Sequence, residues 1–539
     1  MQTDEERELS AAVARVLESK SRKKLIVAGP GAGKTTLFRE LLAQAPGGHD
    51  DRLVLTFINN LKADLDRSLG ETASVYTLHG YCQLLLRRHA ELRDGMTADF
   101  ICHPGLTGLI KRDWEWLKEV VAPLFVERMR SLACTEDEEQ FYLARSAYYD
   151  ALDFDDSVYR VTRRLNDRPD VIPSYELVLI DEFQDFNRME SEIISLLSRA
   201  SPIVIAGDDD QALYGQLRGA SWDYIRAHHA SGEFEVFELP FCMRCPEVIV
   251  GAINDVIAHA VAAEKLAGRI TKPFRFFPPV KGEDSERYPL IDLVQTSVQS
   301  KPANYFGKYV EQLIRAIPEE DFASAAEKFE SCILIIGSKP YLPQVEAHLV
   351  EAGLLEVKAD EARDEHSEAL MLLHADPASN LGWRILLAGL SDAEAKNYVR
   401  VAAQQNLPLS DVLPDDLKAG WLLEAEAHAA KKAEEPAQTV DSASPKIVLT
   451  SYEGSKGRSA QYVVLVGLHD NELPRQPAAA SDIEICKFLV GLTRTKKQCT
   501  ILATRRFGNL ARALSSFIGW IRNNRFRRIE VTKAFWAGK

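Results

Sequence analysis

The chain has 539 residues, of which 46% are hydrophobic and 27% are charged, the proportions of an ordinary soluble globular protein long enough for three or four compact units. Its net charge of −14 is unusual for a protein that binds nucleic acid. The sequence has neither a long apolar run nor a signal-peptide pattern at its polar N-terminus, which predicts a cytoplasmic protein that does not cross a membrane.

The first predicted strand leads into a glycine-rich turn, in the stretch LIVAGPGAGKT at residues 25–35. Small residues let backbone N–H groups approach phosphate oxygens, and the following helix adds the positive end of its dipole. Lys34 would reach the β- and γ-phosphates of a nucleotide, and the Thr35 hydroxyl would ligate Mg²⁺. The alternative is a chance glycine turn. The predicted nucleotide-binding residues here are Ala28, Gly29, Pro30, Gly31, Ala32, Gly33, Lys34, Thr35 and Thr36.

Two more strand-then-loop units follow along the chain. Residues 53–57 form an apolar run that ends in Ile58-Asn59-Asn60, and residues 75–80 lead through His79 into a helix. Residues 88–172 are mostly helical and charged, which indicates an insertion between two strands of one sheet. Strands joined by crossover helices predict a parallel α/β sheet.

The stretch VLIDEFQD at residues 178–185 places acids where a buried strand ends. In open α/β sheets, side chains at that point face the ligand crevice. We therefore predict that Asp181 holds the Mg²⁺ of a bound nucleotide, that Glu182 polarises the attacking water and that Gln184 lies near the γ-phosphate. Another predicted strand, residues 203–207, ends in Asp208-Asp209-Asp210-Gln211.

A second α/β set follows, with strands predicted at residues 290–294, 333–336, 447–450, 463–466 and 500–503. Between residues 423 and 446 lies a segment rich in Ala, Glu and Lys that then contains Pro and Ser, which indicates a linker or a loose helix. The cysteines are scattered except for Cys242-Met243-Arg244-Cys245. One CxxC without a second pair is weak evidence for a metal site, so we interpret them as reduced thiols.

Basic residues gather at the C-terminal end, where Glu530 is the single acid between Arg494 and Lys539. The run 522–528 places Phe526 among arginines, which suits a track for nucleic-acid phosphates. A solvated face of a C-terminal helix explains the run equally well.

The ordered motifs resemble one family, the superfamily 1A helicases of the UvrD/Rep/PcrA group, over nearly the whole chain. The form of residues 181–185, Asp-Glu-Phe-Gln-Asp, is its most specific motif. The matches are residues 28–35 to motif I, 56–59 to motif Ia, 77–80 to the Thr-Phe-His motif, 152–156 to the Asp-Phe-Asp-Asp segment, 181–185 to motif II, 207–220 to motif III, Arg244 to motif IV, 455–457 to motif V and 490–494 to motif VI.

The resemblance implies two RecA-like parallel-sheet domains with ATP and Mg²⁺ in the cleft between them. Arg244 and Arg494 would reach the ATP from the second domain as arginine fingers, beside Gln211, Met243 and Gly457. Single-stranded DNA, alone or as the tail of a duplex, would cross both sheets and touch Thr56, Asn59, His79, Tyr214 and Arg218. The expected domains are 1A (1–87 and 173–238), the helical insertion 1B (88–172), 2A (239–380 and 446–539) and a reduced 2B-like helical insertion with linker (381–445).

Several residues depart from the family pattern. The glutamine of the N-terminal motif is replaced by Glu6, the motif IV tyrosine by Met243 and the arginine found after Gly-Lys-Thr in some members by Thr36. These changes put recognition of adenine in doubt, although Gln2 could substitute. The aromatic residue before Arg-Gly-Ala is replaced by Gln216-Leu217, which weakens one expected base-stacking contact. Arg458-Ser459 stands where motif V usually has a glutamate.

The sequence supports two functional hypotheses. The first is an ATP-hydrolysing translocase and helicase that moves 3′ to 5′ on single-stranded DNA. The second is an ATPase switch subunit with little unwinding of its own, as in helicase subunits that pair with a nuclease in Gabija-type phage defence, which the short 2B-like region suggests by analogy. A plain P-loop kinase or GTPase would have no use for a second arginine-bearing domain.

Overall fold

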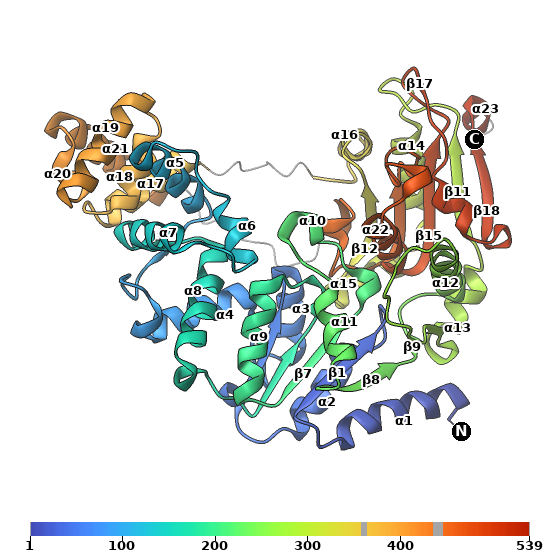
Figure 1. Cartoon of the computed structure of the whole chain (residues 1–539). Coiled ribbons are helices and arrows are strands. Elements are labelled where there is room, and N and C mark those ends of the chain that lie inside the picture. The colour runs from blue at the N-terminus through green and yellow to red at the C-terminus, as the bar shows by residue number, and fades with distance from the viewer. Residues whose placement is uncertain (1, 357–363, 435–445, 538–539) are drawn as a thin grey trace.

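The computed structural model describes residues 2–356, 364–434 and 446–537, and it contains two six-stranded, all-parallel sheets. The strand order is β3-β2-β6-β7-β1-β8 in the first sheet and β13-β12-β14-β15-β11-β18 in the second. Helices cover both faces of each sheet (Figure 1). This confirms the predicted fold class.

The first sheet is built from short apolar runs that are buried on both faces. Leu25 and Val27 of β1 face one hydrophobic core, while Ile26 and Ala28 face another, because successive side chains of a strand point to opposite sides. The elements of this unit are α1 (Asp4–Glu18), β1 (Lys23–Ala28), α2 (Lys34–Gln44), β2 (Arg52–Thr56), α3 (Asn59–Leu69), β3 (Ser74–Thr77), α4 (Leu78–Arg88), β6 (Leu177–Ile180), α9 (Arg188–Ala200), β7 (Ile203–Gly207), α10 (Gly215–Arg218), α11 (Asp223–Ala230) and β8 (Glu235–Leu239).

The insertion between β3 and β6 is helical apart from one short strand pair. Its Trp114 packs edge-on against Phe125 and Phe141, with ring centroids 5.7 and 4.9 Å away. Its elements are β4 (Ile101–Cys102), α5 (Leu106–Lys118), α6 (Phe125–Arg130), α7 (Glu136–Tyr149), β5 (Ala151–Leu152) and α8 (Phe154–Asp167).

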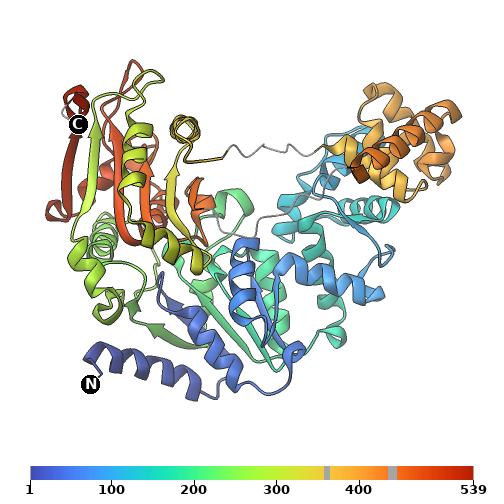
Figure 2. The same ribbon diagram turned by 180° about the vertical axis from the view of Figure 1, so that it is seen from behind.

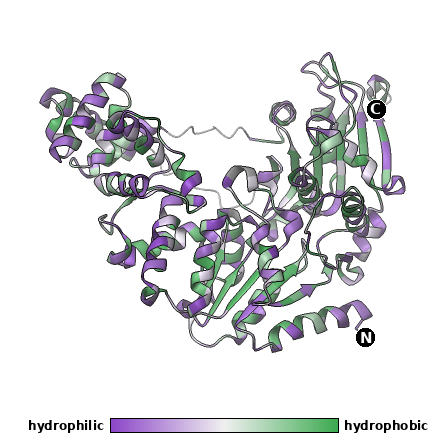
Figure 3. Ribbon diagram, in the orientation of Figure 1, coloured by the Kyte–Doolittle hydropathy of each residue, from purple (hydrophilic) through white to green (hydrophobic). Residues whose placement is uncertain are grey.

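The second sheet also has a separate hydrophobic core on each face. In Figure 3 its strands, like those of the first sheet, are mainly hydrophobic and the surrounding helices carry hydrophilic outer faces. Its elements are β9 (Phe241–Cys242), α12 (Glu247–Ala262), β10 (Arg275–Phe276), α13 (Pro278–Arg287), β11 (Ile291–Thr296), α14 (Tyr305–Ala316), α15 (Glu319–Glu327), β12 (Ser331–Gly337), α16 (Leu342–Glu351), β13 (Ile447–Thr450), β14 (Ala460–Val466), α22 (Asp482–Thr493), β15 (Thr495–Thr504), β16 (Arg506–Phe507), β17 (Leu510–Ala511), β18 (Phe526–Val531) and α23 (Lys533–Ala537).

A helical unit interrupts the second domain but lies against the insertion of the first, as both views show (Figures 1 and 2). Its Leu370 and Trp383 belong to the same hydrophobic core as Trp114 of α5. Helix α17, which begins at Glu365, packs on α18 and α21, so we propose that it belongs to this unit together with the expected residues from 381. Part of the expected linker, residues 435–445, lies outside the described residues. The unit comprises α17 (Glu365–Ala375), α18 (Asn380–Leu387), α19 (Asp392–Gln405), α20 (Leu409–Val412) and α21 (Asp415–Glu434).

The basic C-terminal run does not lie on one face of an α-helix, because Asn523–Arg525 form a single 3-10 turn and an edge strand begins at Phe526. Phe526–Val531 pairs with β11 as strand β18. Arg527 is salt-bridged to Asp292 at 2.7 Å and Arg525 to Asp255 at 2.6 Å, so acids of the same domain already neutralise these two arginines. Among the described residues, no helix is both long and apolar enough to cross a membrane.

Candidate nucleotide and nucleic-acid site

The glycine-rich turn after β1 lies directly against a segment of the second domain. Gly31 and Gly33 have positive φ values of 69° and 87°, which glycine adopts without strain. A Cβ at Gly31 would collide with the Cβ of Arg244, and one at Gly33 would lie 2.5 Å from the Cε of Met243. The backbone N–H of Met243 donates to the Gly31 carbonyl at 2.9 Å. Glycines are therefore needed for the close approach of the two domains.

Three charged residues of the first domain meet at the mouth of this turn. The Lys34 ammonium lies 3.5 Å from Oε1 of Glu182. Burial acts to lower the pKa of Lys34, but the carboxylates of Glu182, Asp181 and Asp208 raise it above the usual value. Burial together with the charge of Glu182 raises the pKa of Asp181 to about 6. A site that concentrates negative charge here is suited to a cation beside the lysine.

Two glutamines form hydrogen bonds with the acids that follow strands β6 and β7. Gln184 donates to Oε2 of Glu182 at 2.5 Å, and its Oε1 accepts from the backbone N–H of Asp208 at 2.9 Å. Gln211 donates to Oδ2 of Asp208 at 2.6 Å and accepts from Nη2 of Arg494 at 2.9 Å. Gln211 therefore links the first domain to an arginine of the second.

Both predicted finger arginines lie in the cleft. Arg494 is only 3% exposed, and burial beside Arg244 lowers its pKa to about 9. Nη1 of Arg244 lies 3.5 Å from the carbonyl of Thr493, the residue before Arg494. A cavity of about 750 Å³ separates the domains, and the predicted residues that line it are Pro30, Gly31, Ala32, Gly33, Lys34, Thr35, Asp181, Glu182, Gln211, Met243, Arg244, Gly457 and Arg494.

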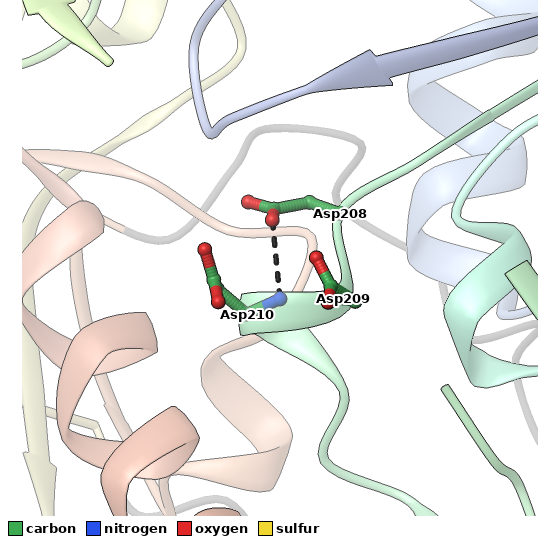
Figure 4. Close-up of side chains that lie close together, drawn as sticks. All are labelled: Asp208, Asp209 and Asp210. Atoms are coloured by element: carbon green, nitrogen blue, oxygen red, sulfur yellow. Dashed lines mark hydrogen bonds between the residues drawn. The ribbon is translucent and has the colours of Figure 1, made fainter. Parts of the chain in front are cut away.

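The three consecutive acids after β7 form a compact carboxylate cluster, with ligand atoms within 4.8 Å of one another (Figure 4). Lys272 of the second domain fills it, because its Nζ lies 2.8, 2.8 and 2.7 Å from oxygens of Asp208, Asp209 and Asp210. Arg226 and Arg269 add further ion pairs at 2.9 and 2.7 Å. Basic side chains already neutralise this cluster. It is therefore a group of salt bridges that joins the two domains rather than a metal site.

The residues at the positions expected to recognise the nucleotide base differ from those of the family. The carboxylate of Glu6 accepts from the backbone N–H of Thr3 at 2.8 Å and so caps helix α1. Thr36 is exposed on α2, and neither residue lines the cavity. Met243 does line it, together with Lys281 and Asp284 of α13.

The predicted DNA contacts fall into two groups. His79, Tyr214 and Arg218 come together around Phe57: the Arg218 guanidinium lies 4.5 Å from the Phe57 ring centre and 3.1 Å from Nε2 of His79, and the Tyr214 ring lies 5.1 Å from that of Phe57. Asn59 is exposed at the start of α3, whereas Thr56 is fully buried. The Thr56 side chain therefore cannot contact DNA in this conformation, because it lies inside the sheet.

Comparison with known proteins agrees with these motifs. Residues 9–126 and 136–231 match the family model of the UvrD/REP helicase N-terminal domain. The ATP-dependent DNA helicase PcrA of Staphylococcus epidermidis is 27% identical over 277 residues, which cover 44% of this chain and 38% of the relative. UvrD1 of Mycobacterium tuberculosis is 28% identical over 287 residues, covering 44% and 37%. The first domain of the chain is therefore similar to the N-terminal domain of UvrD/REP helicases. The matched region spans less than two-fifths of the length of these curated relatives.

One charged residue that lines the cavity was not predicted from the sequence. Lys456 is 2% exposed, and its Nζ lies 2.5 Å from Oδ2 of Asp185, 2.5 Å from the carbonyl of Gln211 and 3.7 Å from Oε2 of Glu182. Its neighbour Gly457 was predicted. The signal was present in Ser455-Lys456-Gly457, the segment that resembles motif V, but the position of the lysine side chain follows only from the structure.

Proposed function

We propose that the protein is an ATP-driven translocase and helicase on single-stranded DNA, working 3′ to 5′. One observation carries the proposal: Arg244 and Arg494 of the second domain enter the cavity that also contains Lys34, Asp181 and Glu182 of the first. A site assembled from two domains couples hydrolysis to their relative movement.

In this mechanism each residue has a separate task. Lys34 and the glycine-rich turn bind the phosphates, and Glu182 takes a proton from the attacking water. Gln184 holds the Glu182 carboxylate in place through its 2.5 Å hydrogen bond. Arg244 and Arg494 stabilise the charge that develops on the transferred phosphoryl group.

The Thr35 hydroxyl and the Asp181 carboxylate are the groups that would hold Mg²⁺. Both line the cavity, and both are oxygen donors of the kind this ion prefers. Burial and the neighbouring Glu182 carboxylate raise the pKa of Asp181, and a divalent cation beside it would offset both effects, which supports this donor set. When bound, the ion would neutralise charge on the β- and γ-phosphates.

For DNA we propose the surface formed by Asn59, Tyr214 and Arg218 above the buried Phe57. Arg218 and Asn59 offer donors to phosphates, and Tyr214 offers a half-buried ring beside them. Phe154 of α8 adds a ring that is 47% exposed and lies 6.2 Å from the His79 ring, edge to face. Aromatic faces beside basic groups are typical of single-strand binding surfaces.

The test combines ATP hydrolysis with and without single-stranded DNA and strand separation on 3′-tailed and 5′-tailed duplexes. We expect DNA to stimulate hydrolysis, separation of the 3′-tailed duplex alone, and DNA affinity that falls steeply between about 50 and 200 mM salt. Arg218→Ala should weaken DNA binding, whereas Arg199→Ala, on the exposed side of α9, should not. Stimulated hydrolysis without strand separation would support the ATPase switch instead.

A further inference from the structure

The segment that carries Arg244 is enclosed by two cysteines. Cys242, Met243, Arg244 and Cys245 form a bend between strand β9 and helix α12, which begins at Glu247 after Pro246. Both cysteines are free thiols and fully buried. The Cys245 sulfur lies within hydrogen-bond reach of Cys242 and also of the Thr493 carbonyl at 3.6 Å.

This cysteine pair lies against the proposed phosphate site at two points, the glycine-rich turn and the residue before Arg494. The Cys242 sulfur would lie 3.3 Å from a Cβ at Gly31, so it faces the phosphate-binding turn. The Thr493 carbonyl that Cys245 contacts is also the one that Arg244 approaches at 3.5 Å, and the next residue is Arg494.

The local geometry makes Cys242 the more reactive thiol. Burial acts to raise its pKa, but hydrogen bonds from the Cys245 thiol and from the backbone N–H groups of Cys245 and Arg244 outweigh burial and lower the pKa to about 7. A CxxC pair next to an arginine is a known arrangement for such a thiol, because the positive charge and the second thiol stabilise the thiolate. The pKa of Cys245 is raised well above its usual value, first by its hydrogen bond to Cys242.

We propose that Cys242 and Cys245 form a reversible disulfide that switches off ATP hydrolysis, with a peroxide as the oxidant. The Cys242 thiolate attacks one peroxide oxygen, the O–O bond breaks, and the departing hydroxide takes up a proton to become water. The Cys245 sulfur then attacks the resulting sulfenic sulfur. The S–S bond forms, the S–O bond breaks, and a second water leaves with the Cys245 proton. Two electrons pass from the two thiols to the peroxide.

The disulfide would act through the residues between the two sulfurs. A disulfide requires the sulfurs to be about 2.05 Å apart, much closer than two hydrogen-bonded thiols, so the bend must tighten. Tightening moves the backbone of Met243 and Arg244 and removes the Cys245 thiol from the Thr493 carbonyl. Because a misplacement of about 1 Å can cost about 100-fold in rate, we expect hydrolysis to fall at least tenfold. Both thiols are fully buried and the Cys242 sulfur faces Gly31 of the first domain, so we expect oxidation when the cleft opens.

The experiment uses the full chain, first reduced and then treated with hydrogen peroxide. Trypsin cleaves after Arg244 and separates the two cysteines, so the disulfide appears as two peptides that remain linked until a reductant is added. We expect this link in the nucleotide-free protein, slower linking when a non-hydrolysable ATP analogue and Mg²⁺ are bound, and recovery of ATP hydrolysis after reduction.

The controls separate this pair from other thiols. Each variant is compared with its own reduced sample, so differences in basal rate cancel. Cys242→Ser and Cys245→Ser should resist inactivation, whereas Cys102→Ser, which removes an exposed thiol, should remain sensitive. The absence of the linked peptides, or equal inactivation of Cys242→Ser and the unchanged protein, would overturn the proposal. The inactivation rests on the proposed ATPase function, but the peptide link does not. A reduced protein that hydrolyses no ATP would therefore contradict that function without affecting the link.

Discussion

Glu182 is held in a strained backbone conformation between two lysines. Its φ of 54° is in the left-handed region, which non-glycine residues rarely adopt. Burial acts to raise the pKa of its carboxyl, but Lys34, Lys456 and Gln184 outweigh burial and lower it to about 2. The carboxylate is therefore ionised at neutral pH and able to accept a proton from water. Strain retained at one position of a cavity is typical of a functional residue.

We predict that Glu182→Gln preserves ATP binding and nearly abolishes turnover. Glutamine has the same shape and still accepts from Gln184, but it cannot take the proton of the attacking water. We expect kcat to fall about 1,000-fold or more, the order also expected for Arg494→Ala. Single-turnover hydrolysis and binding of a fluorescent ATP analogue check this, with Glu192→Gln, at a partly exposed position of α9, as the control. A normal kcat in Glu182→Gln would disprove its role as the base.

The residues that recognise adenine in the family are replaced in this chain, so we predict weak discrimination between ATP and GTP. Glu6 is engaged in capping α1, and Met243 offers a thioether contact worth about 0.3–1.5 kcal/mol that does not distinguish purines. We expect kcat/KM for GTP within about tenfold of that for ATP, measured with saturating single-stranded DNA, a gap of about 1.4 kcal/mol. A preference of a hundredfold or more would show that another residue reads adenine.

Glu190 is a fully buried acid beside the proposed DNA surface, 3.5 Å from Nη2 of Arg218. Burial raises its pKa from 4.5 to about 7, although Arg218 acts in the opposite direction. A carboxyl whose pKa is higher in the folded state contributes stability that is complete below about pH 4.5 and is lost as the pH rises through 7.

We therefore predict that Glu190→Gln reduces the dependence of stability on pH. Glutamine resembles the protonated acid, so the Tm of the variant minus that of the unchanged protein should increase from pH 5 to pH 7.5. The difference corresponds to at most about 3 kcal/mol, at about 1.4 kcal/mol per pKa unit. Thermal unfolding across this range measures it, and Glu192→Gln should follow the unchanged protein. A difference in Tm that is constant with pH would contradict the prediction.

At the scale of elements, helix α18 is tied to the first domain by a buried ion cluster. Arg384 of α18 donates to Asp113 of α5 at 2.8 Å, and Arg145 of α7 donates to the same carboxylate at 2.9 Å. The Arg384 guanidinium also lies 4.7 Å from the Trp116 ring. The Tyr148 hydroxyl donates to the carbonyl of Leu407 at 2.9 Å. The helical unit is therefore packed as part of the first domain.

We predict that Arg384→Met loosens the helical unit. Loss of one partner from a buried ion pair costs about 3 kcal/mol or more, and Arg145 keeps Asp113 partly neutralised. Hydrogen exchange in α17–α21 and proteolysis of that unit should both become faster. Arg400→Met is the matched control, because its ion pair with Glu119 is exposed and is worth at most about 1 kcal/mol. Unchanged exchange in Arg384→Met would show that apolar packing alone holds the unit.

At the scale of the molecule, the chain forms two bodies joined at the cleft. One body contains the first sheet, its insertion and the helical unit, and the other contains the second sheet (Figure 1). The bodies are joined by polar contacts, which are Lys456 with Asp185, Arg494 with Gln211, and Lys272 with the three acids after β7, and by the packing of Leu213 in the core of the second body. Polar contacts of this kind exchange more readily than an apolar core, which suits bodies that move.

We predict that nucleotide changes the distance between the bodies but not within them. With dyes at Gln404 of α19 and Lys308 of α14, energy transfer should change when a non-hydrolysable ATP analogue replaces ADP. With dyes at Gln404 and at Glu115 of α5, it should stay constant. A change in the second pair would mean that the helical unit moves independently of the first domain.

The sequence by itself determined the two parallel sheets and predicted most of the residues that meet in the cavity between them. Strands buried on both faces appear as continuous apolar runs, and a Gly-Lys-Thr turn or an Asp-Glu pair at a strand end has few alternative chemistries, so local patterns suffice for Lys34, Asp181 and Glu182. Arg244 and Arg494 followed from the order of the motifs. The edge strands β8 and β18 were not predicted, because partly exposed strands with charged residues lack a strong apolar signal.

Only the tertiary structure decided which residues of distant segments meet. Lys456 became part of the site because the second domain brings it to Asp185, and Lys272 because it reaches the acids after β7. The Thr56 side chain is buried in the sheet and so does not lie on the proposed DNA-binding surface. The helical unit was placed on the first domain by a buried arginine and aspartate 271 positions apart. Such contacts depend on packing between units, and no local pattern of residues encodes the partner of a buried charge.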